Sequence, residues 1–451
     1  MTELHAPRKA RTGFIPSVLL AAILNPLNSA TISVGLVTIL RALHASSAGI
    51  LWIVSGYYLG SAVAQPIMGA WGDRLGYRRF VYLGFGFILL TAVLAPLSHN
   101  LWIFVGWRVV QAIGTSMVYP NAIGLVRRWE AKRLAAVLGW IGMAAGIALA
   151  IGPALGGLLM DRFGWQSIFW LNIPIVLAAA ILLRISVPGD PARPPSPRRE
   201  SDWAGSSWFT LTMVFGLLAT SGAVPGGGFW FAILAAAALM ALSRVERHAA
   251  RPVIPVAWFR IPLFSLLAAV TVLTNLVMYS ALYGIPVLLE TRRHLSVRQS
   301  GFMLLIFAGS MALGSPLGGR LAKTPLRRTP YLASAALLPL ASALIWVGAH
   351  RGLWMMGLAL ALMGLSFAVS NVVLQQMVLE IRPPGESGSA SGLYSLMRYV
   401  GTMASSVVIA LAFAGPRTLN ILYLGLLSAG VLATGLGLGF PATRAAPVEV
   451  S

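Results

Sequence analysis

Two arginines stand out because each interrupts a long hydrophobic stretch in which no carboxylate occupies the middle. They are Arg108 and Arg398. A charged side chain at the centre of a membrane helix costs about 2.5–3.5 kcal/mol on insertion scales, so such residues usually face a bundle interior or a water-filled cavity. The two guanidinium groups therefore predict a cationic interior that favours neutral or anionic small molecules over cations.

Polar side chains recur at helical spacing near these arginines. Arg108, Gln111, Thr115 and Tyr119 follow one another at i, i+3, i+7 and i+11 and so share one helix face. Aromatic and amide groups at a bundle centre suit amphipathic or aromatic ligands. Two alternatives stay open: an arginine satisfied by backbone carbonyls, and tyrosines that hydrogen-bond between helices. The further candidates for a substrate cavity are Asn25, Asn28, Asn275, Tyr279, Tyr283, Asn371, Gln375, Tyr394 and Arg398.

The stretches that carry these residues require lipid as their surroundings. The chain has 451 residues, of which 57% are hydrophobic and 10% charged, and its mean hydropathy is +0.80. A soluble domain carries about 25% charged residues. A membrane-spanning helix needs about 20 apolar residues, and the stretches are too long for the strands of a membrane barrel. We therefore expect an all-α membrane protein with fourteen transmembrane helices.

The order of the stretches predicts two similar halves around a short insertion. We expect an N-terminal six-helix half (1–187), a cytoplasmic linker (188–204), two inserted helices (205–245), a cytoplasmic loop (246–262) and a C-terminal six-helix half with a tail (263–451). Most Lys and Arg fall in alternate loops, which places both termini in the cytoplasm and the chain in the cytoplasmic membrane. The same bias explains the net charge of +21 without nucleic acid. Arg292, Arg293 and Arg298 are exceptions, on an expected outer loop.

A weak internal repeat supports the two halves. The segment from Gly69 to Arg79 recurs from Gly318 to Arg328, with a matching glycine, a middle cation and a closing Arg-Arg pair. Ala322 stands where the first copy has Asp73. Repeated halves of this kind are typical of secondary transporters.

Four ordered motifs resemble the major facilitator superfamily. The first segment, Gly69 to Arg79, resembles its loop signature of a glycine, Asp-Arg, a second glycine and two basic residues. The fourth expected span (101–126) is similar to its buried-arginine motif, and the fifth (134–160) to its antiporter signature. The junction of spans 5 and 6 resembles that of the drug:proton antiporters with fourteen spans. The buried-arginine motif contains Arg108, Gln111, Gly114 and Pro120. The antiporter signature contains Gly142, Gly146, Gly152, Pro153, Gly156 and Gly157. The junction contains Trp165, Phe169, Asn172 and Pro174.

The resemblance implies roles in conformational change rather than in ligand choice. It implies that Asp73 lies near the N-terminus of a neighbouring helix, where the dipole favours a carboxylate, with Arg74 and Arg78 bridging. The alternative is a loop that only ends a span. Glycines four residues apart let helices pack closely, which serves gating or plain packing. The candidate gating residues are Gly69, Asp73, Arg74, Gly76, Arg78, Gly142, Gly146, Gly152, Pro153, Gly156 and Gly157.

One position departs from the family pattern. The family typically has a Leu-Asp pair in its first span, where this chain has Leu27-Asn28, within the apolar stretch 14–40. An amide neither titrates nor carries charge, which weakens both proton coupling and the binding of cationic drugs. The remaining candidates for a proton-linked group are Asp73 and Glu290. Glu290 is alternatively a surface ion-pair partner of Arg292 and Arg293.

No enzyme signature is present. The sequence has no phosphate-binding loop, no His/Cys metal cluster and no nucleophile–base pair, so we expect no catalytic residues, no metal and no cofactor. We expect a monomeric secondary transporter in the lipid bilayer that exports small amphipathic molecules by alternating access, driven by protons. The alternatives are a proton-independent facilitator or exchanger of neutral or anionic small molecules, and a membrane sensor that does not transport.

Overall fold

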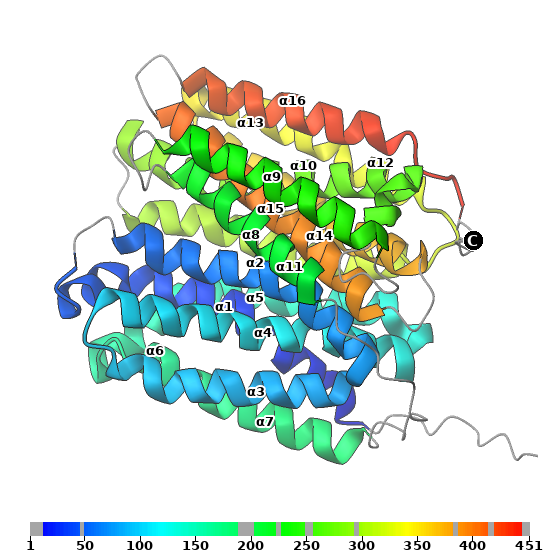
Figure 1. Ribbon diagram of the computed structural model, residues 1–451. Helices are drawn as coiled ribbons and strands as arrows, with labels where there is room; N and C mark the ends of the chain where they lie inside the picture. Colours follow the sequence, from blue (N-terminus) through cyan, green and yellow to red (C-terminus); the bar gives the residue numbers. More distant parts are fainter. Residues whose placement is uncertain are drawn as a thin grey trace, which may run out of the picture. The chain divides into compact units, whose positions relative to one another are not determined.

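The computed structural model describes residues 12–45, 49–187, 203–221, 227–248, 256–292, 297–381, 387–413 and 419–443. These residues form sixteen α-helices and three short 3₁₀-helices (Figure 1). The described part contains no β-strand, only an isolated antiparallel bridge between Leu326 and Thr443. The all-α prediction is confirmed. The expected linker lies almost wholly outside the described residues.

The helices follow the apolar stretches closely. The first nine are α1 (Phe14–Ala42), α2 (Gly49–Leu75), α3 (Tyr77–Leu94), α4 (Leu101–Trp129), α5 (Leu134–Phe163), α6 (Ser167–Trp170), α7 (Asn172–Ser186), α8 (Trp203–Ser221) and α9 (Gly228–His248). The remaining seven are α10 (Pro262–Arg292), α11 (Val297–Leu321), α12 (Arg328–Ala335), α13 (Leu337–Arg351), α14 (Leu353–Ile381), α15 (Ser387–Phe413) and α16 (Leu419–Gly437). The 3₁₀-helices are η1 (Ala95–Leu97), η2 (Ala131–Arg133) and η3 (Val256–Arg260).

Two expected spans are each divided into two helices. Leu171 separates α6 from α7, and Ala336 separates α12 from α13. The helix α9 runs on to His248, beyond position 245 where the inserted helices were expected to end. By length and composition, ten described segments could cross a membrane. The count of fourteen stays a prediction.

The chain divides into two compact units that interleave along the sequence. The first unit contains Met1–Val137, Ile151–Pro255 and Pro383–Leu393, and the second contains Leu138–Ala150, Val256–Arg382 and Tyr394–Ser451. The helices α5 and α15 therefore contribute residues to both units.

In the first unit, α4 packs against α1, α2 and α3, and α3 runs beside α7 (Figure 1). Phe104, Trp165 and Phe169 form an edge-to-face aromatic cluster, with ring centroids 5.6–6.3 Å apart. The helix α9 packs on α8. Few residues of α9 are buried within the structure, 11% of its most apolar stretch.

In the second unit, α14 is the central helix. In its most apolar stretch, 72% of the residues are buried. The helix packs against α10, α11, α12 and α13. The core of the unit is built from aliphatic, methionine and aromatic side chains, among them Phe307, Met356, Met363 and Leu422. The helix α16 covers α10, α12 and α13 (Figure 1).

Candidate functional site

Arg108 is enclosed within the first unit, with 2% of its surface exposed. Its Nη1 donates a hydrogen bond to Oε1 of Gln111 at 2.5 Å. Residues three apart on a helix are neighbours, so α4 itself brings the two side chains together. The ring of Tyr57, from α2, lies over the guanidinium with its centroid 4.2 Å from Cζ, a cation–π contact. No carboxylate of the described residues contacts Arg108.

Gln111 extends these contacts to two further helices. Its Nε2 donates to Oδ1 of Asn28, in α1, at 3.4 Å. Asn172, the first residue of α7, donates from Nδ2 to the same oxygen at 2.9 Å. The hydroxyls of Tyr57 and Thr115 lie 3.2 Å apart. Six buried residues from four helices thus form one group, here named the Arg108 cluster: Asn28, Tyr57, Arg108, Gln111, Thr115 and Asn172.

Two atoms of the Arg108 cluster are left with unused hydrogen-bonding capacity. Arg108 Nε and Asn28 Nδ2 are both buried and have no hydrogen-bond partner among the described residues. Both atoms are donors. Buried polar groups are usually paired, so each unpaired group calls for an explanation.

Within the first unit, the structure brings together four of the predicted cavity residues. Asn28, Arg108, Gln111 and Thr115 meet in the Arg108 cluster, and the same unit contains Asn25 and Tyr119, both half-buried. Tyr57 was missed, although a polar ring in an apolar stretch was a usable signal. Asn172 was identified only through the span 5–6 junction. The second unit contains Asn275, Tyr279, Asn371, Gln375, Tyr394 and Arg398.

In the second unit, Asn275 Nδ2 donates to the carbonyl of Thr271 at 2.8 Å. The hydroxyl of Tyr394 donates to the carbonyl of Asn371 at 2.9 Å. Tyr394 therefore joins α15 to α14, which is the interhelical role considered for the tyrosines. The side chains of Tyr283 and Glu290 lie outside the described residues.

Asp73, at the end of α2, is bound on both carboxylate oxygens. The hydroxyl of Tyr77 donates to Oδ1 at 2.6 Å. The backbone N–H and the hydroxyl of Ser389, in the first turn of α15, donate to Oδ2 at 2.7 and 2.6 Å. The dipole of a helix favours a negative charge at its N-terminus, so the carboxylate is well placed there. Gly76, between α2 and α3, has a φ of +110°, a conformation that side chains disfavour.

Arg78, the second arginine of the loop, was expected to bridge to Asp73 and instead contacts an aromatic ring. Arg78 lies over the ring of Tyr82, with Cζ 5.6 Å from the centroid, and makes no contact with Asp73 among the described residues. Tyr77, which the sequence had not singled out, holds the carboxylate instead.

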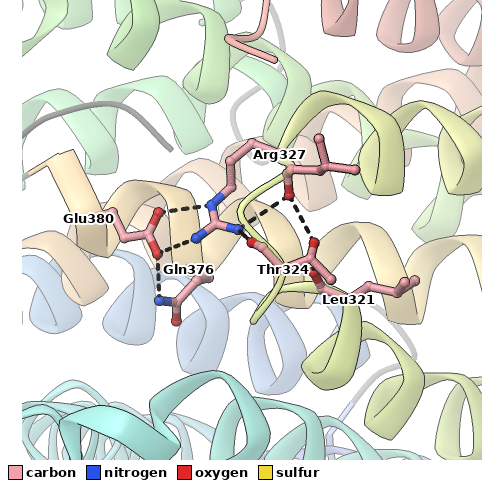
Figure 2. A network of polar contacts seen from close by, with 6 residues as sticks. Leu321, Thr324, Arg327, Gln376 and Glu380 are labelled. Carbon is pink, nitrogen blue, oxygen red and sulfur yellow. Dashed lines mark hydrogen bonds and ion pairs between the residues drawn. The ribbon is translucent and has the colours of Figure 1, made fainter. Parts of the chain in front are cut away.

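The second copy of the loop uses different chemistry. Arg327 forms a bidentate ion pair with Glu380, with Nε 2.9 Å from Oε2 and Nη2 2.8 Å from Oε1 (Figure 2). Gln376 donates to Oε1 of the same carboxylate at 2.9 Å, and Nη1 of Arg327 donates to the carbonyl of Thr324. Only the closing Arg-Arg pair of the repeat pointed to this contact.

The glycines of α5 divide into two groups. A Cβ at Gly142 would lie 2.6 Å from Ser315 Oγ, and one at Gly146 would lie 2.9 Å from the backbone of Ala312, both in α11. A Cβ at Gly152 would lie 2.4 Å from Ala30, in α1. Gly156 likewise approaches Thr31 in α1. Gly157 is half-buried, and the side chain of Pro153 is outside the described residues. Gly69, in α2, is buried.

The described residues contain no group of three or more His, Cys, Asp and Glu side chains that could hold a metal ion. The polar groups of the Arg108 cluster instead suit the binding of an organic molecule or an anion.

Comparison with known proteins agrees with this architecture. The family model of the Major Facilitator Superfamily matches residues 18–406. The MFS-type transporter YvkA of Bacillus subtilis is 31% identical over 442 residues, covering 96% of this chain and 97% of its own. A tetracenomycin C resistance and export protein of Streptomyces glaucescens is 30% identical over 397 residues, covering 85% of this chain and 72% of its own.

A solved structure shows the same fold. The proton:xylose symporter XylE, bound to 6-bromo-6-deoxy-D-glucose, superimposes with a TM-score of 0.66 at 13% identity, covering 95% of each chain. The family match spans most of the sequence, and the helices are arranged as in a transporter of that family. The chain therefore belongs to the major facilitator superfamily.

Proposed function

We propose that the chain exports small amphipathic molecules by alternating access. The observation that carries this proposal is the hydrogen-bonded contact between Asp73, in the first half of the repeated sequence, and Ser389, in the second half. Alternating access needs contacts between halves that can break and re-form. Relatives described as a resistance and export protein and as multidrug resistance proteins support export as the direction.

The proposal includes a fourteen-span protein of the drug:proton antiporter type, acting as a monomer, with the domain boundaries predicted above. It would lie in the cytoplasmic membrane with both termini in the cytoplasm. Exposed tryptophans near helix ends, among them Trp102, Trp230 and Trp354, support helices that reach the surface of a membrane. Tryptophan is enriched where a membrane meets water.

Proton coupling is the first energy source to test, with Asp73 and Glu290 as the proton-linked candidates. The alternative is a proton-independent facilitator or exchanger of neutral or anionic molecules. Asn28 favours this alternative, because it occupies the span-1 position with an amide that accepts two hydrogen bonds and cannot titrate. A sensor without transport is a third candidate, which predicts binding without flux.

Transport by the purified protein in liposomes distinguishes these candidates. Export of a neutral or anionic dye that follows an imposed pH gradient supports the antiporter. Movement that follows only the dye gradient supports the facilitator. Dye binding with no flux in either condition supports the sensor and contradicts the proposed function.

A further inference from the structure

We propose that the Arg108 cluster is a binding site for one monovalent anion, of the carboxylate or halide type. The inference deepens the proposed function, because such an anion can be the charged group of the exported molecule. The site is defined by Arg108, Asn28 and the residues that orient them.

The hydrogen bonds of the cluster run in one direction, and the cation sets that direction. Arg108 can only donate, so its bond fixes the amide oxygen of Gln111 toward the guanidinium. Gln111 must then present its NH₂ group to Asn28, and Asn172 presents another. The oxygen of Asn28 accepts both of these hydrogen bonds. Its own NH₂ group is therefore the last donor of the series, with no acceptor among the described residues.

The spare groups of the cluster are therefore donors. They are Arg108 Nε and Asn28 Nδ2, both buried and without a partner among the described residues. A water molecule could accept their hydrogen bonds but would not offset the charge of the guanidinium. A buried charge requires a partner of opposite sign, and no described carboxylate contacts Arg108. An anion meets both needs.

The geometry also limits the class of anion. Tyr57 covers one face of the guanidinium, and Gln111 occupies Nη1, which leaves the edge that carries Nε. That edge is one to which a carboxylate can bind with both oxygens. The cluster contains a single full positive charge, which matches a monoanion rather than a phosphate dianion.

Binding to the purified full-length protein in detergent micelles tests the site without requiring transport. The organic probe is radiolabelled benzoate, and the neutral compound of the same shape is benzamide. Chloride is the inorganic probe, and the dianion sulfate replaces it in the control buffer. We expect benzoate to bind at least about tenfold more tightly than benzamide, a difference of one decade in Kd. Competition by chloride is expected if both anions use the same site.

Two variants and one control separate the site from general damage. Arg108→Gln removes the charge, and Asn28→Asp supplies a fixed internal carboxylate at nearly constant shape. Each should weaken benzoate binding at least about tenfold, whereas Arg320→Gln, at an exposed arginine in the last turn of α11, should not change it. Asn28→Asp keeps the test valid if Arg108→Gln does not fold.

The outcomes divide clearly. Binding of benzoate alone identifies an organic anion, and binding of chloride alone identifies an inorganic one; both support an anion site. Equal binding of benzoate and benzamide, no binding of either anion, or unchanged benzoate affinity in Asn28→Asp overturns it. Benzoate that binds at this site in a protein showing no flux of any dye would contradict the proposed function and leave the anion site intact.

Discussion

Arg327 and Glu380 form a bidentate ion pair that links the start of α12 to the end of α14. Their side chains are 4% and 10% exposed. The backbone N–H of Arg327 also donates to the carbonyl of Ala442 at 3.1 Å, so the segment after α16 is attached to the same point. Three parts of the second unit therefore depend on one arginine.

We expect Arg327→Gln to destabilise the protein by about 3 kcal/mol, because removing one partner of a buried ion pair leaves the other charge uncompensated. The neighbouring Arg328→Gln is the matched control, since Arg328 is exposed and makes one long hydrogen bond to Leu438. The double variant Arg327→Gln/Glu380→Gln should lose less than Arg327→Gln alone. Thermal unfolding in detergent checks this, and equal melting of the two single variants would contradict it.

Gly72→Ala should destabilise the contact between α2 and α4 by about 1–3 kcal/mol, the usual cost of overpacking. A Cβ at Gly72 would lie 1.5 Å from Oδ1 of Asn121. Asn121 cannot move away easily, because its Nδ2 donates to the carbonyls of Met68 and Met117. The control is Gly86→Ala, whose Cβ would meet nothing within 4 Å. If both variants unfold at the same temperature, the contact does not constrain this position.

Gly142→Ala should impair packing between α5 and α11, and a second substitution should restore it. The added Cβ would meet Oγ of Ser315 at 2.6 Å and its Cβ at 2.8 Å. Ser315→Gly removes both atoms, so the double variant is expected to regain stability and transport lost in Gly142→Ala. Contacting residues show such coupling of about 0.5–3 kcal/mol. Strictly additive losses in melting temperature would show that the contact is not the cause.

Asp73→Asn should reduce transport about tenfold, through a change in the balance of conformations rather than in ligand affinity. The amide loses charge and one acceptor, and a loss of about 1.4 kcal/mol corresponds to a factor of ten. Ser389→Ala should have a smaller effect, since the backbone N–H of residue 389 still donates. Because the chain has no cysteine, a single introduced cysteine beside Ser389 can report accessibility. Glu130→Gln, at a half-buried acid after α4, is the control; equal effects would refute a specific role for Asp73.

Phe440→Ala should destabilise the second unit by about 3–5 kcal/mol, as expected for a buried phenylalanine. Phe440 is 2% exposed, and its ring centroid lies 4.9 Å from that of Tyr331. Leu438→Ala is the control, because Leu438 is 61% exposed. Chemical unfolding of the two variants in the same detergent gives the comparison, and a loss in Phe440→Ala no larger than in Leu438→Ala would contradict it.

Much of the fold could be predicted because the bilayer imposes simple rules on length and polarity. The breaks at Leu171 and Ala336 could not, since a local interruption leaves an apolar stretch unchanged. The extension of α9 to His248 was missed for the opposite reason: helical backbone continues where apolar composition ends.

The candidate site was only partly predictable. Spacing on one helix placed Arg108 beside Gln111, but spacing says nothing of which other helix approaches. Tyr57 and Asn172 join the cluster through tertiary packing. The partner of Asp73 is 316 positions away, and nothing local to either residue identifies the other.

No carboxylate of the described residues lies against Arg108, and this has an electrical consequence. A monoanion carried outward without a proton would be driven by the resting voltage of the cell, which is negative inside. That voltage contributes about 2.3 kcal/mol per elementary charge for each 100 mV, equivalent to a concentration ratio of about fifty at equilibrium. Export of an anionic molecule without a proton would therefore be driven by the voltage and would need no pH gradient.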